Sequence, residues 1–131
     1  MSASVSVMLI VPDADRAVAW YVEALGAEVL WDLGGVAGLA VDGAPFFLHE
    51  VNPGNPAEAS PEQVGATSVQ VELFVQDPDA VIARAAQAGA HDVREAVEHE
   101  MPWGRHRQGG FTDPSGHRWS VGDHSPLPGQ G

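Results

Sequence analysis

Two stretches of the chain alternate apolar and polar residues in nearly the same way. Residues 5–11 read Val-Ser-Val-Met-Leu-Ile-Val and residues 69–75 read Val-Gln-Val-Glu-Leu-Phe-Val, so each places Val, Val, Leu and Val on one face. Asp13 and Asp77 follow these stretches, at positions where a carboxylate can cap the first turn of a helix. The pattern predicts, in both places, a half-buried strand that runs into a helix.

The rest of the first half completes one supersecondary unit. Apolar residues recur at helical spacing until Gly26, a typical stop signal; they are Val18, Tyr21, Val22 and Leu25. Three strands are then expected over residues 27–33, 36–41 and 45–51, with a hairpin turn at Asp42-Gly43. The first half is therefore predicted to be βαβββ.

The second half repeats this order after a Pro- and Gly-rich stretch. A helix is expected from Pro78 to about Gly89, because proline is favoured in a first helical turn and glycine at a helix end. Strands follow over residues 91–99, 105–112 and 117–122, and the residues between the last two, Asp113-Pro114-Ser115-Gly116, have the preferences of a type I turn. We predict a single α+β domain over residues 1–131. Its parts are a module over 5–51, a surface linker over 52–68, a second module over 69–122 and a loose tail over 123–131.

The two modules are copies of one unit. Residues 5–24 align with residues 69–88 without a gap, and the identical pairs include Val5/Val69, Val7/Val71, Leu9/Leu73, Val11/Val75, Asp13/Asp77 and Asp15/Asp79. If the shared Val and Leu face packs under the helix, the opposite face must line something else. That face differs between the copies, at Ser6/Gln70, Met8/Glu72 and Ile10/Phe74. Two curved sheets of this kind are expected to enclose a cup there.

The composition restricts the possible partners. The 131 residues carry 18 acidic against 6 basic side chains, a formal net charge of -12, and a field of this sign repels nucleic acid and anionic membranes. It favours a cationic ligand, although a solvated acidic surface is the simpler explanation. Cysteine is absent, and no apolar run near the start has the length of a membrane span or the basic flank of a signal peptide. We expect a soluble, cytoplasmic protein with no nucleic acid or membrane partner.

Two segments carry a resemblance to a known superfamily. Residues 11–26, which end in Trp20-Tyr21 and Leu25-Gly26, and residues 111–119, which contain Asp113-Pro114-Ser115-Gly116, resemble the vicinal oxygen chelate superfamily. That group comprises glyoxalases, bleomycin resistance proteins and extradiol dioxygenases, and Pro102-Trp103-Gly104 also resembles a segment often found in it. The resemblance implies paired βαβββ modules that form a cup-shaped mixed sheet, with two cups usually assembled across a homodimer.

The enzymes of that superfamily hold a divalent metal with His or Glu on strand positions that face the cup. Those positions fall on Ser6, Gln70 and Ser120 and, when Leu48-His49-Glu50 is aligned with Trp119-Ser120-Val121, on His49. Hydroxyls and a carboxamide bind transition metals far more weakly than imidazole or carboxylate does. We therefore expect no metal, no cofactor and no catalytic residue. The resemblance is closest to metal-free antibiotic-binding members, which sequester drugs such as bleomycins, mitomycins or enediynes. We therefore expect an aromatic natural product as ligand, for which the negative net charge permits a cationic group.

Strand parity selects the candidate ligand-binding residues. On the first strands of the two modules they are Met8, Gln70, Glu72 and Phe74, and on the last strand Arg118 and Ser120, with Trp119 in the core. Phe47 and His49 join them unless Phe46, Leu48 and Glu50 face the cup instead, and Trp31 either lines the pocket or closes the sheet. Met101 and Trp103 fall in a connection containing Pro and Gly, where they could stack on a flat ligand or serve ordinary loop or dimer packing.

Other functions stay open at this point. If the strand alignment slipped, His99, His106, His117 and Glu72 could compose an unusual metal site, which would fit a glyoxalase-like or dioxygenase-like enzyme acting on a small molecule. A small-molecule sensor or an inert scaffold subunit is a third interpretation. The basic cluster Arg105-His106-Arg107 is either solvated or available to a ligand carboxylate or phenolate.

Overall fold

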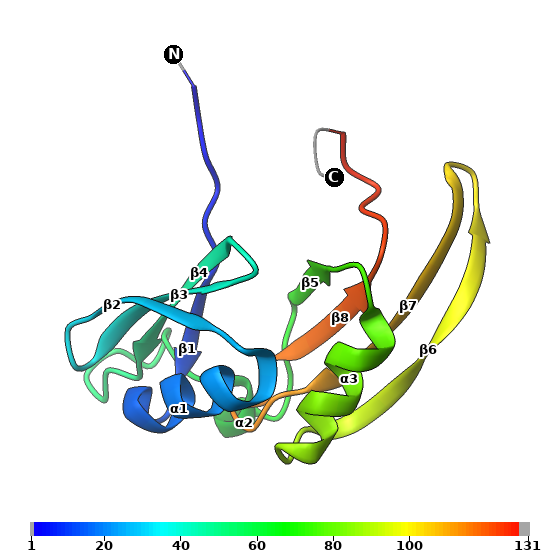
Figure 1. Cartoon of the computed structure of the whole chain (residues 1–131). Helices are drawn as coiled ribbons and strands as arrows, with labels where there is room; N and C mark the ends of the chain where they lie inside the picture. Colours follow the sequence, from blue (N-terminus) through cyan, green and yellow to red (C-terminus); the bar gives the residue numbers. More distant parts are fainter. Residues whose placement is uncertain (1, 129–131) are drawn as a thin grey trace.

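The computed structural model describes residues 2–128 as two sheets with helices packed on one side (Figure 1). The first module contains β1 (Met8–Val11), α1 (Ala14–Leu25), β2 (Glu28–Asp32), β3 (Val36–Val41) and β4 (Ala44–Glu50). A short helix, α2 (Pro61–Val64), lies in the connection. The second module contains β5 (Gln70–Phe74), α3 (Pro78–Gln87), β6 (His91–Met101), β7 (Gly104–Thr112) and β8 (Arg118–Gly122). Residues 129–131 of the predicted tail lie outside the described part.

Each module forms its own four-stranded mixed sheet. The strand order is β1-β4-β3-β2 in the first sheet and β5-β8-β7-β6 in the second. In both, the first strand runs parallel to the last strand of its module, and the other neighbours are antiparallel. The predicted pair of βαβββ units is confirmed. Both β1 and β5 are edge strands, so each module presents an unpaired edge.

The main helices begin and end where the sequence predicts. The carboxylates of Asp13 and Asp77 each accept a hydrogen bond, from Arg16 N and Ala80 N respectively, both at 3.1 Å. Gly26 ends α1 with φ of 65°, a left-handed conformation that glycine adopts easily. Among residues 2–128, no helix is long and apolar enough to cross a membrane.

The predicted linker over residues 52–68 contains a short helix that the sequence analysis did not identify. Helix α2 begins after Ser60, whose backbone N donates to Gln63 Oε1 at 2.9 Å in a capping box. Glu62 N donates to Ser115 O at 3.0 Å, so the helix is tied to the turn before β8. The Ser-Pro-Glu-Gln segment at the start of this helix is a capping-box signal in the sequence. The surrounding Pro and Gly residues favour a loop and led to the prediction of a linker.

Helices α1 and α3 pack together through a reciprocal pair of contacts. Trp20 Nε1 donates to Ala88 O at 2.8 Å, beyond the end of α3, and Arg84 Nε donates to Glu23 O at 2.8 Å, in the last turn of α1. Trp20 and Arg84 are equivalent positions in the alignment of residues 5–24 with 69–88. Each helix therefore caps the carbonyl end of the other, which joins the two modules on their helical side.

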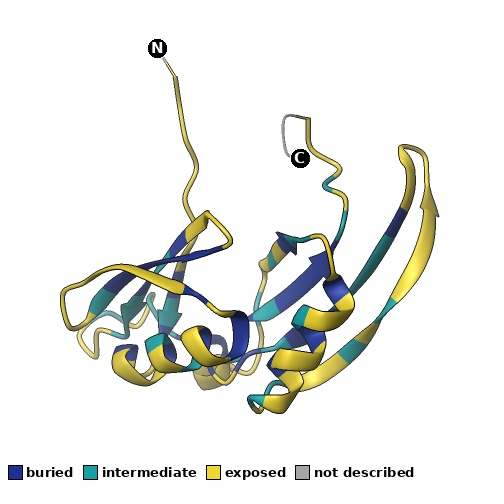
Figure 2. Cartoon of the chain, viewed as in Figure 1, coloured by how far each residue is buried: buried dark blue, intermediate teal, exposed yellow. Residues whose placement is uncertain are grey.

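A single hydrophobic core runs beneath both sheets. Of the predicted Val and Leu face, Leu9, Val11 and Leu73 are buried, whereas Val5, Val7 and Val69 are exposed, because β1 and β5 begin only at Met8 and Gln70. The large aromatics at the junction of the modules are buried as well; the core also includes Phe46, Leu48, Phe111, Trp119 and Val121. Tyr21 lies 5.3 Å from Phe46, and Phe46 lies 5.4 Å from Trp119, centroid to centroid. Figure 2 shows this buried band along the sheets, while the long β6–β7 hairpin is largely exposed.

A buried carboxylate fixes the junction. Asp113, which is 1% exposed, accepts hydrogen bonds from Tyr21 Oη and Trp119 Nε1, so it joins a residue of α1 to a residue of β8. The same side chain accepts from the backbone N of Ser115 and His117 and closes the turn before β8. Burial and then the charge of Asp113 raise the pKa of the Tyr21 phenol well above its usual range.

Candidate functional site

The outer face of the first sheet carries an apolar row. Register partners across the four strands are Met8, Phe47, Gly38 and Trp31. Trp31 lies over Gly38, where a Cβ would meet the indole ring, and its ring centroid is 6.4 Å from that of Phe47. Because Phe46 and Leu48 are buried under the helix, Phe47 and His49 lie on the outer face of the first sheet. The predicted residues Met8, Trp31, Phe47 and His49 thus share one surface.

The alignment of His49 with Ser120 was wrong by two residues. Met8 pairs with Phe47, and the equivalent residue of the second module, Glu72, pairs with Ser120. Phe47 is therefore the counterpart of Ser120, and His49 is the counterpart of Gly122. The error arose because β4 has no turn motif like the one that positions β8. His49 Nδ1 lies 2.6 Å from Glu50 O, so its ring is engaged by the backbone.

The outer face of the second sheet is polar. The predicted residues Gln70, Glu72, Phe74, Arg118 and Ser120 lie in adjacent register on β5 and β8. Gln108 on β7, which was not predicted, joins two of them: its amide N contacts Ser120 Oγ and lies 3.4 Å from Glu72 Oε1. Gln108 Oε1 also lies 2.9 Å from His106 Nε2. The parity of strand residues 105–112 was the signal that could have identified Gln108 and His106.

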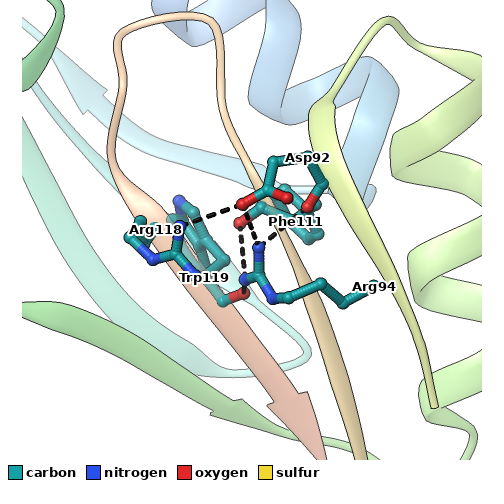
Figure 3. A network of polar contacts seen from close by, with 5 residues as sticks. All are labelled: Asp92, Arg94, Phe111, Arg118 and Trp119. Carbon is teal, nitrogen blue, oxygen red and sulfur yellow. Dashed lines mark hydrogen bonds and ion pairs between the residues drawn. The ribbon is translucent and has the colours of Figure 1, made fainter.

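A carboxylate of the same chain neutralises the charge of Arg118 (Figure 3). Its Nη1 lies 2.9 Å from Asp92 Oδ2, and the same oxygen lies 2.9 Å from Arg94 Nη1. Arg94 also donates to the backbone carbonyl of Trp119 at 3.0 Å. Asp92 has a φ of 45°, an unusual conformation for a residue with a side chain, which turns it toward the two arginines. Arg118 therefore lies on β8 as one member of an ion-pair network.

The β6–β7 hairpin extends past the rest of the second sheet as an arm, defined here as residues 97–106. Contrary to the prediction of an irregular connection, Met101 ends β6, and Trp103 lies in the tight turn before Gly104. The Trp103 indole stacks on the His106 imidazole with centroids 5.9 Å apart and planes 12° apart. His99 lies on the other strand, 5.4 Å from His106. Trp103 is 48% exposed, whereas His106 is 7% exposed.

The alternative metal site is not assembled in this fold. His99 and His106 lie together on the arm, but His117 Nε2 is 2.7 Å from Ile10 O at the junction of the modules. Within residues 2–128, no three His, Cys, Asp or Glu side chains come close enough together to hold a metal ion.

The other basic residues of the β7 cluster are also paired. Arg107 makes a bidentate contact with Asp79 at 2.6 and 2.8 Å, and Arg105 lies 3.2 Å from Glu100. The hydrogen bond from Arg107 lowers the pKa of the Asp79 carboxyl, and the same bond raises the pKa of Arg107. Alternation along β7 directs both arginines away from the face that carries His106 and Gln108.

A cavity of about 340 Å³ lies behind the sheets rather than on the cup side. It is formed at the junction of the modules by α1, α2 and the turn before β8, and it is lined by Arg16, Trp20, Tyr21, Glu62 and Pro114, among others. None of the predicted ligand-binding residues lines this cavity.

The candidate residues lie on two separate surfaces and do not form one closed cup within a single chain. The apolar set lies on the first sheet and the polar set on the second, and the two sheets are separate. The modules bury their helical sides against each other through Tyr21, Phe46 and Trp119, which leaves both outer faces open. Exposed apolar side chains gather on these faces and on the arm; they are Met8, Trp31, Val97, Met101 and Trp103.

Comparison with known proteins gives a consistent picture. Residues 4–121 match the family model described as the Glyoxalase/Bleomycin resistance protein/Dioxygenase superfamily. The uncharacterized protein Mb0911c of Mycobacterium bovis is 36% identical over 122 residues, which cover 87% of this chain and 78% of that protein. The uncharacterized protein Rv0887c of Mycobacterium tuberculosis is also 36% identical, with 70% of its length covered.

Solved structures share the arrangement of the two modules. TioX from Micromonospora sp. ML1 superposes with a TM-score of 0.71 and 29% identity over 95% of this chain and 100% of that chain. The fosfomycin resistance protein FosX from Mesorhizobium loti superposes with a TM-score of 0.66 over 96% of this chain and 95% of that chain. At 13% identity, the FosX match shows a common fold alone.

Proposed function

Because this chain belongs to the glyoxalase/bleomycin resistance protein/dioxygenase superfamily, we propose that it binds a small natural product in a cup and protects its host by sequestering that compound unchanged. The superfamily name covers both enzymes and resistance proteins, so the choice depends on the residues that face the cup. The ligand would be a DNA-damaging compound of the bleomycin, mitomycin or enediyne type. The proposal rests on the chemistry of the side chains that occupy four particular strand positions.

These four positions are the ones where the enzymes of the superfamily place metal ligands. With the corrected register they are Ser6, Phe47, Gln70 and Ser120. A phenyl ring supplies no donor, and two hydroxyls and a carboxamide make a weak set for zinc, iron or manganese. The residues present therefore do not fit a catalytic divalent metal. Binding is the function that these side chains can perform.

The two outer faces differ in a way that suits an amphipathic ligand. Trp31, Phe47 and Met8 offer an apolar wall for a flat ring, whereas Glu72, Gln108 and Ser120 offer hydrogen-bonding groups. The net charge of -12 adds an attraction for cationic groups. Small-molecule sites commonly combine an apolar lining with a few polar groups that fix orientation.

We further propose that a second copy of the chain completes each cup. Strands β1 and β5 are unpaired edges of separate sheets, and the outer faces of both sheets stay open in one chain. A two-fold dimer that sets the first module of one copy against the second module of its partner covers the exposed Met8 and Trp31. Each cup then has one apolar and one polar wall. Light scattering coupled to gel filtration should give the mass of a dimer.

Titration of the intrinsic tryptophan fluorescence against bleomycin, a mitomycin and an enediyne tests the proposal. We expect saturable quenching by at least one of them, because two of the four tryptophans, Trp31 and Trp103, lie on the proposed cup. Trp103→Ala and Gln70→Ala should weaken binding and also reduce the growth protection of a host exposed to the compound. Trp20→Phe is the matched control, since Trp20 lies between the helices and should leave the affinity unchanged.

Three results would contradict sequestration. A stoichiometric transition metal in protein purified without chelator would favour the enzyme. Recovery of a chemically altered compound after incubation with the protein would do the same. Absence of binding and of protection across the panel would leave the fold intact and remove the resistance role.

A further inference from the structure

His106 has an unexplained polar atom. The residue lies on β7 with 7% of its surface exposed, and its Nδ1 is the one fully buried side-chain N or O without a hydrogen-bond partner among residues 2–128. Buried polar atoms are almost always paired in native proteins, because leaving one unpaired costs its desolvation free energy. An unpaired atom next to a proposed ligand cup is therefore expected to have a partner when the ligand is bound.

The hydrogen-bond chain on this face fixes which ring nitrogen carries the proton. One end of the Gln108 side chain lies near Glu72 Oε1 and Ser120 Oγ. A carboxylate can only accept, so this end is the NH₂ group and the opposite end is the carbonyl oxygen. That oxygen lies 2.9 Å from His106 Nε2, which must then donate. In the neutral imidazole, Nδ1 is left with a lone pair and acts as an acceptor.

The rings around His106 limit the shape of a partner. A group that donates to Nδ1 lies close to the plane of the imidazole, and this plane is 12° from that of the Trp103 indole. A flat ring that donates to Nδ1 and lies coplanar with the imidazole would extend parallel to the indole, which is the orientation of a stacked pair. Access requires movement of a side chain on the arm, whose Val97, Met101 and Trp103 are exposed and have room to rotate.

We propose that His106 Nδ1 accepts a hydrogen bond from an N–H or O–H group carried by a flat aromatic ring of the ligand, with Trp103 as the stacking partner. This inference rests on the proposed function, because it names the chemistry that the cup selects. The site then prefers phenols, hydroquinones and ring N–H groups over their methyl ethers and over quinones, which offer only acceptors at the same position.

A matched pair of probes tests this selectivity. Binding of 2-naphthol and 2-methoxynaphthalene is measured by isothermal titration calorimetry, since the two differ in one hydrogen-bond donor. The wild-type protein should bind 2-naphthol at least about tenfold more tightly, the ratio expected when a buried acceptor gains or lacks its donor. His106→Phe keeps a ring against Trp103 but removes the acceptor, so the ratio should fall close to one. His99→Phe, the control on the neighbouring strand, should keep the preference.

The protonation of His106 gives a second readout that needs no ligand. Long-range ¹H–¹⁵N correlation spectra of the free protein should show the neutral ring protonated at Nε2, and 2-naphthol should shift the Nδ1 resonance. A proton on Nδ1 in the free protein would overturn the proposal. So would equal affinity for the two probes, binding of neither, or a preference that survives in His106→Phe. Probe discrimination without protection against any natural product would instead remove the resistance role and leave the assignment of His106 in place.

Discussion

The two sheets use the same backbone plan and opposite chemistry, as one row of register partners in each sheet illustrates. In the first sheet the row is Met8, Phe47, Gly38 and Trp31; in the second it is Glu72, Ser120, Gly110 and Arg94. Both rows have a glycine on the third strand of the module. In both, a large side chain from the neighbouring strand fills the space that a Cβ would occupy, Trp31 in one and Arg94 in the other.

This difference shows that the two modules share their buried faces and differ in their outer faces. The buried faces keep Val and Leu because one helix has to pack on each sheet. The outer faces are free of that demand, so one presents an apolar surface and the other a hydrogen-bonding surface. A ligand held between two copies of such sheets would meet both kinds of wall. The following experiments test the comparison, beginning with the largest expected effect.

Removing the shared junction should cost the most stability. Asp113→Ala eliminates the acceptor of Tyr21 Oη and Trp119 Nε1 and leaves two buried donors unpaired. It also removes the carboxylate that closes the turn before β8. We expect a loss of about 3 to 4 kcal/mol in the free energy of unfolding, measured by urea denaturation. Asp15→Ala, an exposed aspartate on α1, should change it little. A loss for Asp113→Ala as small as that of the control would show that the modules do not depend on this carboxylate.

The two glycines should respond differently to the same substitution. A Cβ at Gly110 would overlap the backbone carbonyl of Trp119, whereas the nearest atoms to a Cβ at Gly38 belong to the Trp31 ring. A backbone cannot move aside as a side chain can, so we expect Gly110→Ala to cost about 3 kcal/mol and Gly38→Ala about 1 kcal/mol. Only Gly38→Ala should change the emission spectrum strongly, because it displaces Trp31. Equal costs for the two variants would mean that the backbone beside Gly110 gives way as readily as the Trp31 side chain beside Gly38.

The repeat is also what made the fold predictable. Alternation, the two aspartate caps and Gly26 identified every major helix and strand, because these signals are local and describe one buried face at a time. The site was harder to predict. Parity alone placed Met8, Gln70, Glu72, Phe74 and Ser120 on the outer faces, but it contains no information about neighbours on other strands.

Contacts between strands explain why parts of the candidate site could not be predicted from the sequence. The register that pairs Phe47 with Met8, and the link from Gln108 to Ser120, depend on how strands align, which no local motif in β4 or β7 specifies. The same holds for Asp113, which appears in the sequence as an ordinary turn residue. Its role as a buried acceptor follows only from the docking of one module on the other.

The stability of the junction between the modules should also depend on alkaline pH, through a residue that only the first module has. Tyr21 is the only tyrosine in the chain, and its counterpart in the second module is the buried Ala85. Because burial and Asp113 raise the pKa of Tyr21, the native state favours the neutral phenol. Its contribution to stability is full below the pKa of an unfolded tyrosine, about 10, and is lost as the pH rises from there toward the native value.

Two measurements check this behaviour. Ultraviolet absorbance of the phenolate should show Tyr21 ionising only when the protein unfolds. In urea denaturation, the wild type should lose stability relative to Tyr21→Phe above about pH 10 and not below it. Ionisation of Tyr21 in the folded protein at the pH of a free tyrosine would show that the junction is open to water.

The smallest effect is expected at Arg118, which stands where the first module has Pro45. Its ion pair with Asp92 joins side chains that are 39% and 57% exposed, and Asp92 keeps Arg94 as a partner when Arg118 is replaced. Arg118→Gln should therefore change the free energy of unfolding by less than about 1 kcal/mol, and added salt should reduce the change further. Arg94→Met should cost more, because Arg94 also donates to the backbone carbonyl of Trp119 and fills the space beside Gly110.

The ion pair between Arg118 and Asp92 also leads to a prediction about binding. Because Asp92 neutralises its charge, Arg118 should contribute little to the affinity for a bound compound. If Arg118→Gln abolished the fluorescence response to a compound while leaving stability unchanged, Arg118 would be a binding residue beside its register partner Gln70.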